Sequence, residues 1–380
     1  MDFNLTDEQR ALQEMVRDFA DNELKPHAAH WDEHHIFPAE VVKKMGQLGL
    51  MGVAYDPAYN GAGMDYMSYA IVIEELSRGC AGTGVICSAH SSLACDPINN
   101  YGTEAQKQKY LSRMATGEWI GCFGLTEAGA GSDAGGLKTT ATKDGDGYVI
   151  TGNKLFITNA VEAQVAVIFA ITDRAAGSRG ISAFIVEKGT PGFSIGKVED
   201  KLGIRASSTA ELVFENCRVP AENLLGKEGS GFKIALSTLD GGRIGIAAQA
   251  VGIATAALQT SIAYAKERQQ FGKPIATLQA IQWMIADMAT EIEASRLLVR
   301  QAAWMKDHKM NYGRYSAMAK LFAAEAAMKA TTKAIQIHGG YGYIKEYPVE
   351  RHFRDAKITE IYEGTSEIQR LVIATSYLKD

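Results

Sequence analysis

The sequence lacks the features that mark membrane, secreted or nucleic-acid-binding proteins. Its longest weakly polar run, residues 244–258, falls short of the ~20 residues needed to span a bilayer, so we expect a buried helix there. No block of Lys or Arg interrupts a mildly acidic chain of net charge −5, which argues against nucleic acid or an anionic membrane as the main partner. The opening residues, MDFNLTDE, contain neither a basic nor an apolar segment. We therefore expect no secretory signal or transit peptide and a cytoplasmic location, with the mitochondrial matrix only if a transit peptide was removed.

Cysteine is scarce, and common nucleotide, hydrolase and metal motifs are missing. The five cysteines are odd in number and lack CxxC spacing, which predicts reduced thiols in a reducing compartment. No P-loop, GxSxG nucleophile elbow or internal repeat occurs. Four histidines cluster near Trp31, but they have no carboxylate motif or Cys partner, so we favour a solvated helix face and expect no metal. These are His27, His30, His34 and His35.

The length and patterning of the chain predict several domains. Its 380 residues exceed the roughly 250–300 at which a single core stops growing. The 46% hydrophobic and 22% charged residues are ordinary for a globular protein. Three zones of different periodicity predict an α+β multidomain fold, with a helical domain at 1–118, a β domain at 119–228 and a second helical domain at 229–380.

Local signals support these zones. Capping boxes at residues 6–9 and 103–106 precede apolar residues at helical spacing. In the middle zone, short β-branched or aromatic runs bounded by turns predict strands in a barrel-like or sandwich arrangement. These runs are residues 148–150, 165–169, 181–186 and 212–214. Helical spacing returns in the third zone, for example between Ile281 and Ile292.

Three segments are rich in glycine or polar residues: 123–133, 336–343 and 362–367. Glycine is kept most easily where backbone approaches a ligand or adopts a positive φ, although any one segment alone is best explained as ordinary turns and caps. Residues 129–134 also satisfy the GxGxxA dinucleotide pattern. Strands rather than a helix are expected after them, so a Rossmann site is not favoured.

Together the three segments resemble the acyl-CoA dehydrogenase family, and the resemblance runs essentially end to end. Residues 124–136 match the signature G-L-T-E-x-x-x-G-S-D-x-x-G, and residues 336–355 match Q-x-x-G-G-x-G-Y-x-x-E-x-x-x-x-R-x-x-x-D. Residues 201–205, 238–243 and 358–370 look most like the short-chain, butyryl-CoA branch. The resemblance implies that family's fold: an N-terminal helical domain, a middle β-barrel-like domain and a C-terminal four-helix bundle.

The resemblance also implies sites for FAD and for an acyl-CoA thioester. The implied FAD contacts are Phe123, Leu125, Thr126, Ser132, Phe156, Ile157, Thr158, Arg268, Phe271, Gln279, Gln336, Gly339, Gly340, Thr365 and Glu367. Among them, Arg268, Gln279 and the loop 336–340 match positions that grip the FAD of a neighbouring subunit. The family commonly has Trp where Phe156 stands, so an aromatic face is kept. The implied substrate contacts are Ser132, Asp240, Arg243, Tyr362 and Gly364.

Glu363 matches the family's catalytic base. Removal of an α-proton from a thioester requires a carboxylate base. The oxygen of the thioester carbonyl gains negative charge in this step and requires preorganised hydrogen-bond donors. The resemblance implies that the Glu363 side chain is the base and that the Glu363 N–H is one of the donors to the carbonyl. It also implies that Tyr362 and Ile361 exclude water and raise the pKa of the Glu363 carboxyl. Some branches carry the base just before the Arg that matches Arg243, where this chain has Gly242.

The carboxylate of Asp96 has two interpretations. We favour a helix N-cap with Pro97 at the first helical position over a carboxylate near the acyl tail.

The resemblance implies FAD-dependent α,β-dehydrogenation of a short-chain acyl-CoA to the trans-2-enoyl-CoA, as in fatty acid β-oxidation. It also implies electron-transfer flavoprotein as electron acceptor and a homotetramer built as a dimer of dimers. Branched or alicyclic (cyclohexanecarboxyl-type) thioesters and an acyl-CoA oxidase stay open as alternatives. A glutaryl substrate is less favoured, because residues 81–96 contain no Lys or Arg for a second carboxylate. A non-catalytic acyl-CoA binder would lack the base, whereas Glu363 is present.

Overall fold

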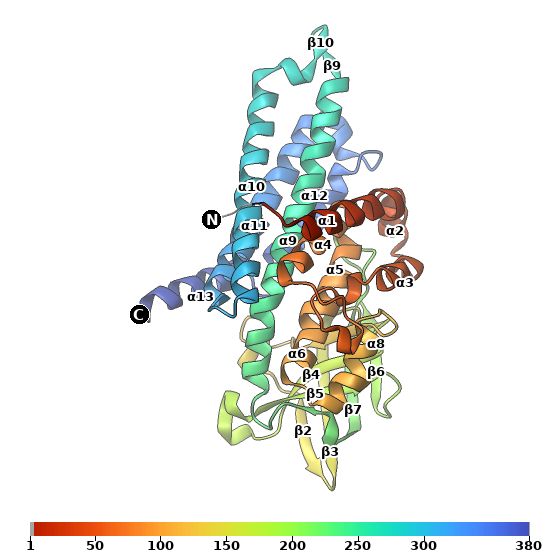
Figure 1. The fold of residues 1–380 in the computed structure, drawn as a ribbon, viewed down its shortest axis with the longest axis vertical. Helices are drawn as coiled ribbons and strands as arrows, with labels where there is room; N and C mark the ends of the chain where they lie inside the picture. Colours follow the sequence, from red (N-terminus) through yellow and green to blue (C-terminus); the bar gives the residue numbers. More distant parts are fainter. Residues whose placement is uncertain (1–3, 380) are drawn as a thin grey trace.

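Helices form both ends of the chain and a sheet forms its middle (Figure 1). The computed structural model describes residues 4–379, so residues 1–3 of the predicted N-terminal domain and Asp380 lie outside the described residues. The β strands lie at one end of an elongated molecule, and the hairpin between α9 and α10 lies at the other. The helical, β and helical order along the chain is the one predicted.

The N-terminal part is a cluster of short helices around the longer α4. Both predicted capping boxes are present, at Thr6 and Thr103, with each threonine accepting from the N–H three residues on. The α-helices are α1 (Asp7–Phe19), α2 (Ala28–His34), α3 (Ala39–Gln47), α4 (Tyr66–Gly79), α5 (Ala81–Ser88), α6 (Asp96–Tyr101), α7 (Glu104–Gln106) and α8 (Ser112–Met114). The π-helical segments are η1 (Ala20–Leu24), η4 (Ala89–Cys95) and η5 (Lys107–Leu111). The 3₁₀ turns are η2 (Leu50–Gly52) and η3 (Pro57–Tyr59).

The middle part is one open, mixed sheet with an edge strand on each side. Its hydrogen-bonded order is β6-β7-β3-β2-β4-β5-β8, and β1 pairs with β4 in parallel. The strands are β1 (Gly121–Gly124), β2 (Thr140–Asp144), β3 (Gly147–Thr158), β4 (Val165–Ile171), β5 (Ile181–Glu187), β6 (Phe193–Val198), β7 (Thr209–Pro220) and β8 (Leu224–Leu225). All four predicted strand runs lie in this sheet. The barrel-like expectation needs correction, because β6 and β8 are edge strands and the sheet does not close.

The glycine-rich segment after β1 does not begin a nucleotide-binding helix. It leads into a single 3₁₀ turn, η6 (Ala134–Gly136), and then into β2. This confirms that the GxGxxA match lacks the context of a Rossmann unit.

The C-terminal part consists of three long helices and two shorter ones. They are α9 (Gly231–Glu267), α10 (Gln279–Asp307), α11 (Gly313–His338), α12 (Val349–Lys357) and α13 (Ser366–Leu378). A hairpin of β9 (Gln269–Gln270) and β10 (Lys273–Pro274) joins α9 to α10, and the 3₁₀ segment η10 (Gly339–Tyr343) follows α11. The turn η11 (Ile358–Glu360) follows α12.

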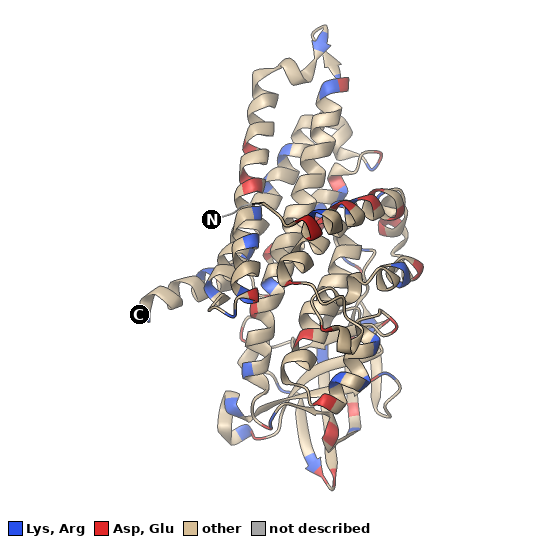
Figure 2. Cartoon of the chain, in the orientation of Figure 1, with Lys and Arg blue, Asp and Glu red and all other residues tan. Residues whose placement is uncertain are grey.

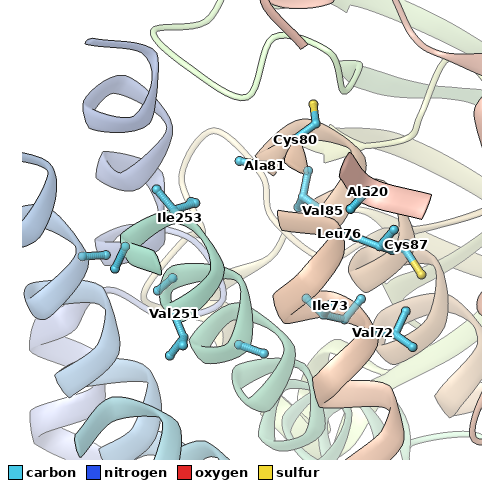
Figure 3. Packing of buried hydrophobic residues seen from close by; sticks show 14 of the residues in the cluster. Ala20, Val72, Ile73, Leu76, Cys80, Ala81, Val85, Cys87, Val251 and Ile253 are labelled. Atoms are coloured by element: carbon cyan, nitrogen blue, oxygen red, sulfur yellow. The ribbon is translucent and has the colours of Figure 1, made fainter. Parts of the chain in front are cut away.

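Helix α9 is the central element of the fold. It is long and apolar enough to cross a membrane by length and composition, but 67% of its apolar window is buried within the protein. Val251 and Ile253 on α9 belong to the same buried cluster as side chains of α4 and α5 (Figure 3). Its middle carries few charges (Figure 2), and a Cβ added at Gly252 would lie 2.3 Å from the carbonyl oxygen of Glu74. The uncharged run at 244–258 is therefore a buried helix, as predicted, with glycine where α4 approaches closely.

The cysteines are buried and reduced. Each of the five lies within the described residues and is a free thiol, as predicted. Burial raises the pKa of Cys87 and Cys122 to about 12, which keeps these thiols protonated.

Candidate active site

A left-handed turn before α13 presents the predicted base. Glu363 has φ +52° and Gly364 has φ +93°, a conformation that a side chain rarely adopts. The carbonyl of Gly364 accepts a hydrogen bond from Gln369 Nε2 (2.8 Å), and that of Glu363 accepts a longer one from the same atom (3.2 Å). Thr365, an implied FAD contact, caps α13 by accepting from the Ile368 N–H. The turn is thus held from the helix that follows it.

The carboxylate of Glu363 is enclosed and unpaired. Although the residue as a whole is half-buried, its Oε2 atom is buried and has no hydrogen-bond partner among the described residues. It faces α9, because a Cβ added at Gly242 would lie 2.1 Å from Oε2 and 2.8 Å from Leu93 Cδ2. Burial raises the pKa of Glu363 to about 8, and the charges of Lys320 and Arg243 oppose that rise. With this pKa most of the group is protonated at neutral pH, and the ionised fraction that can accept a proton grows as the pH approaches 8.

One detail of the expected enclosure is wrong. Ile361 is 49% exposed and cannot keep water from Glu363. Tyr362, the other expected residue, is half-buried and its hydroxyl donates to Gln249 Oε1, while Leu93 of η4 lies beside the carboxylate.

Two cations surround the base, and the sequence pattern indicated only one of them. Arg243 donates from Nη1 to Asp240 Oδ1 (2.6 Å), so two implied substrate residues form an ion pair. Lys320 on α11 is fully buried and donates to the carbonyl of Gly364 (2.8 Å). Burial lowers the pKa of Lys320 to about 8. A lysine on the buried face of a helix, between Ala317 and Ala323, was the signal that could have identified it.

The β domain contributes the first signature. The Leu155 N–H donates to the carbonyl of Thr126 (2.8 Å), so the strand end carrying Phe156 and Thr158 lies beside that signature. Phe156 has φ +60° and is 62% exposed, whereas Leu125 and Ile157 are buried. Phe156 lies at an irregularity of the β3–β7 pairing, between Lys154 and Ile157, and its exposed ring is suited to stack on a planar ligand.

Further residues of the first signature lie in an open loop. Phe123 packs edge-on against Phe169 at 5.0 Å between ring centroids. Ser132 is exposed, and a Cβ added at Gly129 or Gly131 would meet nothing within 4 Å. The loop has room for a ligand.

A cavity of about 610 Å³ lies at the far end of α9. Arg268, Phe271, Gly339 and Gly340 line it, so the structure brings together four implied cofactor residues from distant parts of the chain. The Arg268 guanidinium lies 5.3 Å from the ring centre of Tyr341, and added Cβ atoms at either glycine would meet open space. Arg268 could bind a pyrophosphate here, and the apolar and aromatic side chains that make up most of the lining could contact its nucleoside.

Three other implied cofactor residues do not line this cavity. Gln279 and Gln336 are exposed at the start of α10 and near the end of α11, outside the cavity lining. Glu367 is exposed in the first turn of α13. Between Arg243, whose charge acts on the base, and Arg268, α9 extends on the order of 40 Å at 1.5 Å per residue, so this cavity is far from Glu363 within one chain.

A second cavity, of about 400 Å³, lies at the first turns of α9. Its lining includes Arg179, Phe232, Lys233 and Asp240, two cations and an aromatic ring next to an implied substrate residue. Phe232 also borders the loop of the first signature, because an added Cβ at Gly135 would lie 3.8 Å from its ring. These groups suit the phosphates and chain of a coenzyme A thioester.

The interpretation of Asp96 as an N-cap is wrong. Asp96 continues directly from η4 with helical dihedral angles and makes no capping bond. Its Oδ2 accepts from Lys306 Nζ (2.6 Å) and the Tyr66 hydroxyl (3.2 Å), and its Oδ1 accepts from the Tyr55 hydroxyl (3.0 Å). A glutaryl substrate is less favoured by the sequence because residues 81–96 contain no Lys or Arg for its second carboxylate. A cation from α10, Lys306, does lie beside this segment, but it is paired with Asp96.

Residues 4–379 contain no group of three or more His, Cys, Asp or Glu side chains placed to hold a metal ion. The four clustered histidines are exposed on and around α2. Their exposure agrees with a solvated helix face.

The chain is similar to known proteins along its whole length. Sequence models described as the N-terminal, middle and C-terminal domains of acyl-CoA dehydrogenase match residues 6–118, 122–217 and 229–378. The short-chain specific acyl-CoA dehydrogenase of Clostridium acetobutylicum is 60% identical over 374 residues, covering 98% of this chain and 99% of that protein.

Two solved structures have the same fold over their full length. Butyryl-CoA dehydrogenase from Megasphaera elsdenii superimposes with a TM-score of 0.98 at 49% identity, covering 100% of both chains. A chain in the structure described as "Electron transferring flavoprotein of Acidaminococcus fermentans: Towards a mechanism of flavin-based electron bifurcation" superimposes with a TM-score of 0.99 at 53% identity, also covering 100% of both chains.

Proposed function

Because the chain belongs to the acyl-CoA dehydrogenase family of FAD-dependent oxidoreductases, we propose that it binds FAD and dehydrogenates a short-chain acyl-CoA to the trans-2-enoyl-CoA. One observation carries the proposal. The Oε2 atom of Glu363 is buried and unpartnered among the described residues, and it packs against Gly242 of α9, where an added Cβ would lie 2.1 Å from it. This arrangement suits a base whose partner is a substrate proton.

The reaction needs a proton acceptor on one side of the thioester and an electron acceptor on the other. Glu363 would take the α-proton on its carboxylate, and we assign to its N–H a hydrogen bond to the thioester carbonyl. FAD, when bound, supplies the acceptor that takes the hydride from the β-carbon at its N5 atom. The substrate thus loses one proton and one hydride, and a Cα=Cβ bond forms.

The proposed FAD site combines two parts of the molecule. Phe156 and Thr158, with Thr126 from the first signature, would hold the flavin ring against the sheet. Arg268 and the glycines 339 and 340 would hold the pyrophosphate and adenosine. Because Arg268 lies on the order of 40 Å along α9 from Arg243, whose charge acts on the base, we assign the second group to the FAD of a neighbouring subunit, and the enzyme to a homotetramer.

The proposed substrate site follows α9 from its first turns to Gly242. Arg179 and Lys233 would bind the phosphates of coenzyme A, and Ser132 and Asp240 would contact the pantetheine chain. The acyl group would end beside Leu93 and Glu363. The division into domains at 1–118, 119–228 and 229–380 is part of this proposal.

The physiological acceptor that we propose is electron-transfer flavoprotein, in a cytoplasmic location. The superposition on a chain from the Acidaminococcus structure supports that partner, and the 60% identity to a clostridial protein supports that location.

Anaerobic reduction of the flavin tests the function. The purified protein should be yellow, and butyryl-CoA should bleach its flavin absorption without oxygen. A panel of glutaryl-, branched, cyclohexanecarboxyl- and butyryl-CoA with an artificial acceptor should give the highest kcat/KM with butyryl-CoA. A colourless protein that also fails to take up FAD would contradict the proposal, and rapid turnover with oxygen alone would show an oxidase.

A further inference from the structure

The described site contains a buried cation with no carboxylate partner. Lys320 is fully buried on α11 and, among residues 4–379, forms no salt bridge. Its hydrogen bond is to the carbonyl of Gly364, the residue after the base (2.8 Å). Burying an ammonium group without an ionic partner is costly, so a fold keeps one where the charge is used.

We propose that Lys320 is the positioning residue of the base: its ammonium group fixes the Glu363–Gly364 turn and supplies the counter-charge that lets the unpartnered Glu363 carboxylate ionise. This inference rests on the proposed function and explains how the base is kept ready for the substrate.

The first argument is the backbone of the turn. Glu363 is held at φ +52° although it is not glycine, and such a conformation persists only when its surroundings fix it. Two donors converge on the Gly364 carbonyl, Lys320 Nζ and Gln369 Nε2, each at 2.8 Å. One comes from α11 and one from α13, so the turn is fixed between two helices.

The second argument is the charge around the carboxylate. Arg243 faces Glu363 from α9 but is already paired with Asp240. Tyr69 from α4 and the adjacent Tyr362 face it as neutral phenols, since burial raises the pKa of both. Glu360 and Glu367 are the further carboxylates that act on Lys320. Of the two cations that act on Glu363, Lys320 is therefore the one that forms no salt bridge within residues 4–379.

The test separates the charge of Lys320 from its hydrogen bond. Lys320→Gln keeps a donor for Gly364 and removes the charge, whereas Lys320→Arg keeps the charge. Gln369→Met removes the neutral donor to the same carbonyl, and Lys333→Gln removes a lysine of α11 that pairs with Asp287 at the surface. Lys320→Met is made in parallel as a second neutral variant.

Two measurements are made on each FAD-loaded variant. The first is the pH dependence of flavin reduction by butyryl-CoA. The second is a pH titration of the infrared band of the protonated Glu363 carboxyl, assigned by its absence in Glu363→Gln, and this measurement needs no turnover.

The neutral Lys320 variants should raise the pH at which the carboxyl band disappears by about one unit or more and lower flavin reduction at pH 7 about tenfold, since each unit leaves a tenth of the carboxylate. Lys320→Arg should restore the titration. Gln369→Met should slow the reaction without moving the titration, and Lys333→Gln should match the wild type.

An unchanged band in a folded neutral variant overturns the proposal. If neither neutral variant folds with FAD, Lys320 is a structural residue and the proposal is equally wrong. Failure of butyryl-CoA to reduce the wild-type flavin would contradict the proposed function instead, while the infrared titration would still decide the role of Lys320.

Discussion

Two buried carboxylates lie against neighbouring glycines of α9, and they differ in how completely their oxygens are bonded. An added Cβ at Gly241 would lie 3.2 Å from Asp96 Oδ2, and one at Gly242 would lie 2.1 Å from Glu363 Oε2. Asp96 accepts hydrogen bonds on both oxygens and has Lys306 as its ion pair. Glu363 Oε2 accepts none from the described residues.

The difference separates a structural carboxylate from a reactive one. Breaking the bonds of a satisfied buried pair costs stability, and Asp96 joins α6 to α10 with three of its roughly four acceptor positions occupied. An unsatisfied buried oxygen costs free energy in the resting protein, and it is retained where a ligand or proton completes it. Two carboxylates thus pack against the same helix, Asp96 with a structural role and Glu363 with a catalytic one. The following experiments test this difference.

The largest effect should follow from Glu363→Gln. The amide is nearly isosteric and keeps the backbone N–H, but it cannot accept a proton, so dehydrogenation should fall by about 10²–10⁴ or more. Folding, FAD content and acyl-CoA binding should stay close to wild type. Stopped-flow flavin reduction measures the rate, and wild-type reduction in this variant would show that another residue is the base.

The geometry also limits a rescue of that variant. A glutamate at position 242, where other branches carry the base, would collide with the side chain at position 363. Turnover should therefore return in Glu363→Gly/Gly242→Glu rather than in Glu363→Gln/Gly242→Glu.

Asp96→Ala should act on stability instead of chemistry. It leaves the Lys306 ammonium buried without its partner, which should lower the free energy of unfolding by about 3–5 kcal/mol. The melting temperature of the FAD-loaded protein measures the loss, and Asp96→Leu/Lys306→Met is the matched control that should recover most of it. A large fall in turnover per bound flavin, with an unchanged melting temperature, would reverse the roles assigned to the two carboxylates.

The two adjacent glycines provide a finer test. Gly242→Ala should displace the Glu363 carboxylate and slow flavin reduction, whereas Gly241→Ala should crowd Lys306 Nζ, at 2.7 Å, and lower stability. Overpacking costs about 1–3 kcal/mol, so each effect should be moderate. If both variants lost rate and stability equally, the structural and catalytic roles would not be divided between Asp96 and Glu363.

The pH profile tests the ionisation of the base without any substitution. With the pKa of Glu363 raised to about 8, kcat/KM should rise about tenfold per unit between pH 6 and 7 and level off as the pH passes 8. The sign follows because only the ionised carboxylate accepts the α-proton. A profile already flat at pH 6 would show that the base is ionised in spite of its burial.

The parts of the fold that depend on neighbouring residues could be predicted from the sequence. The capping boxes at Thr6 and Thr103 and the strand runs of β4 and β5 are local signals, and the structure confirms them. The two long signatures likewise indicated the family, because a match to a signature is read along the chain and needs no knowledge of the fold.

The partners of buried charges could not be predicted in the same way. Asp96 and Lys306 are 210 positions apart, and no local pattern links them, so Asp96 was assigned to the common capping pattern. Lys320 stands next to Leu321 in a helix recognised by its apolar spacing, and that spacing gave no reason to single out a lysine. Where an ion pair forms depends on how helices pack, which single-sequence periodicity does not contain.

The glycines of α9 also affect how the molecule folds. Gly241, Gly242, Gly245 and Gly252 together weaken the isolated helix by roughly 3–4 kcal/mol relative to alanine, so α9 has little tendency to form before its neighbours dock. Those neighbours, α4 and η4, are more than a hundred residues earlier in the chain. The stability of α9 therefore depends on long-range contacts, and we expect the pocket around Glu363 to form together with the packing of α4 and η4 on this helix.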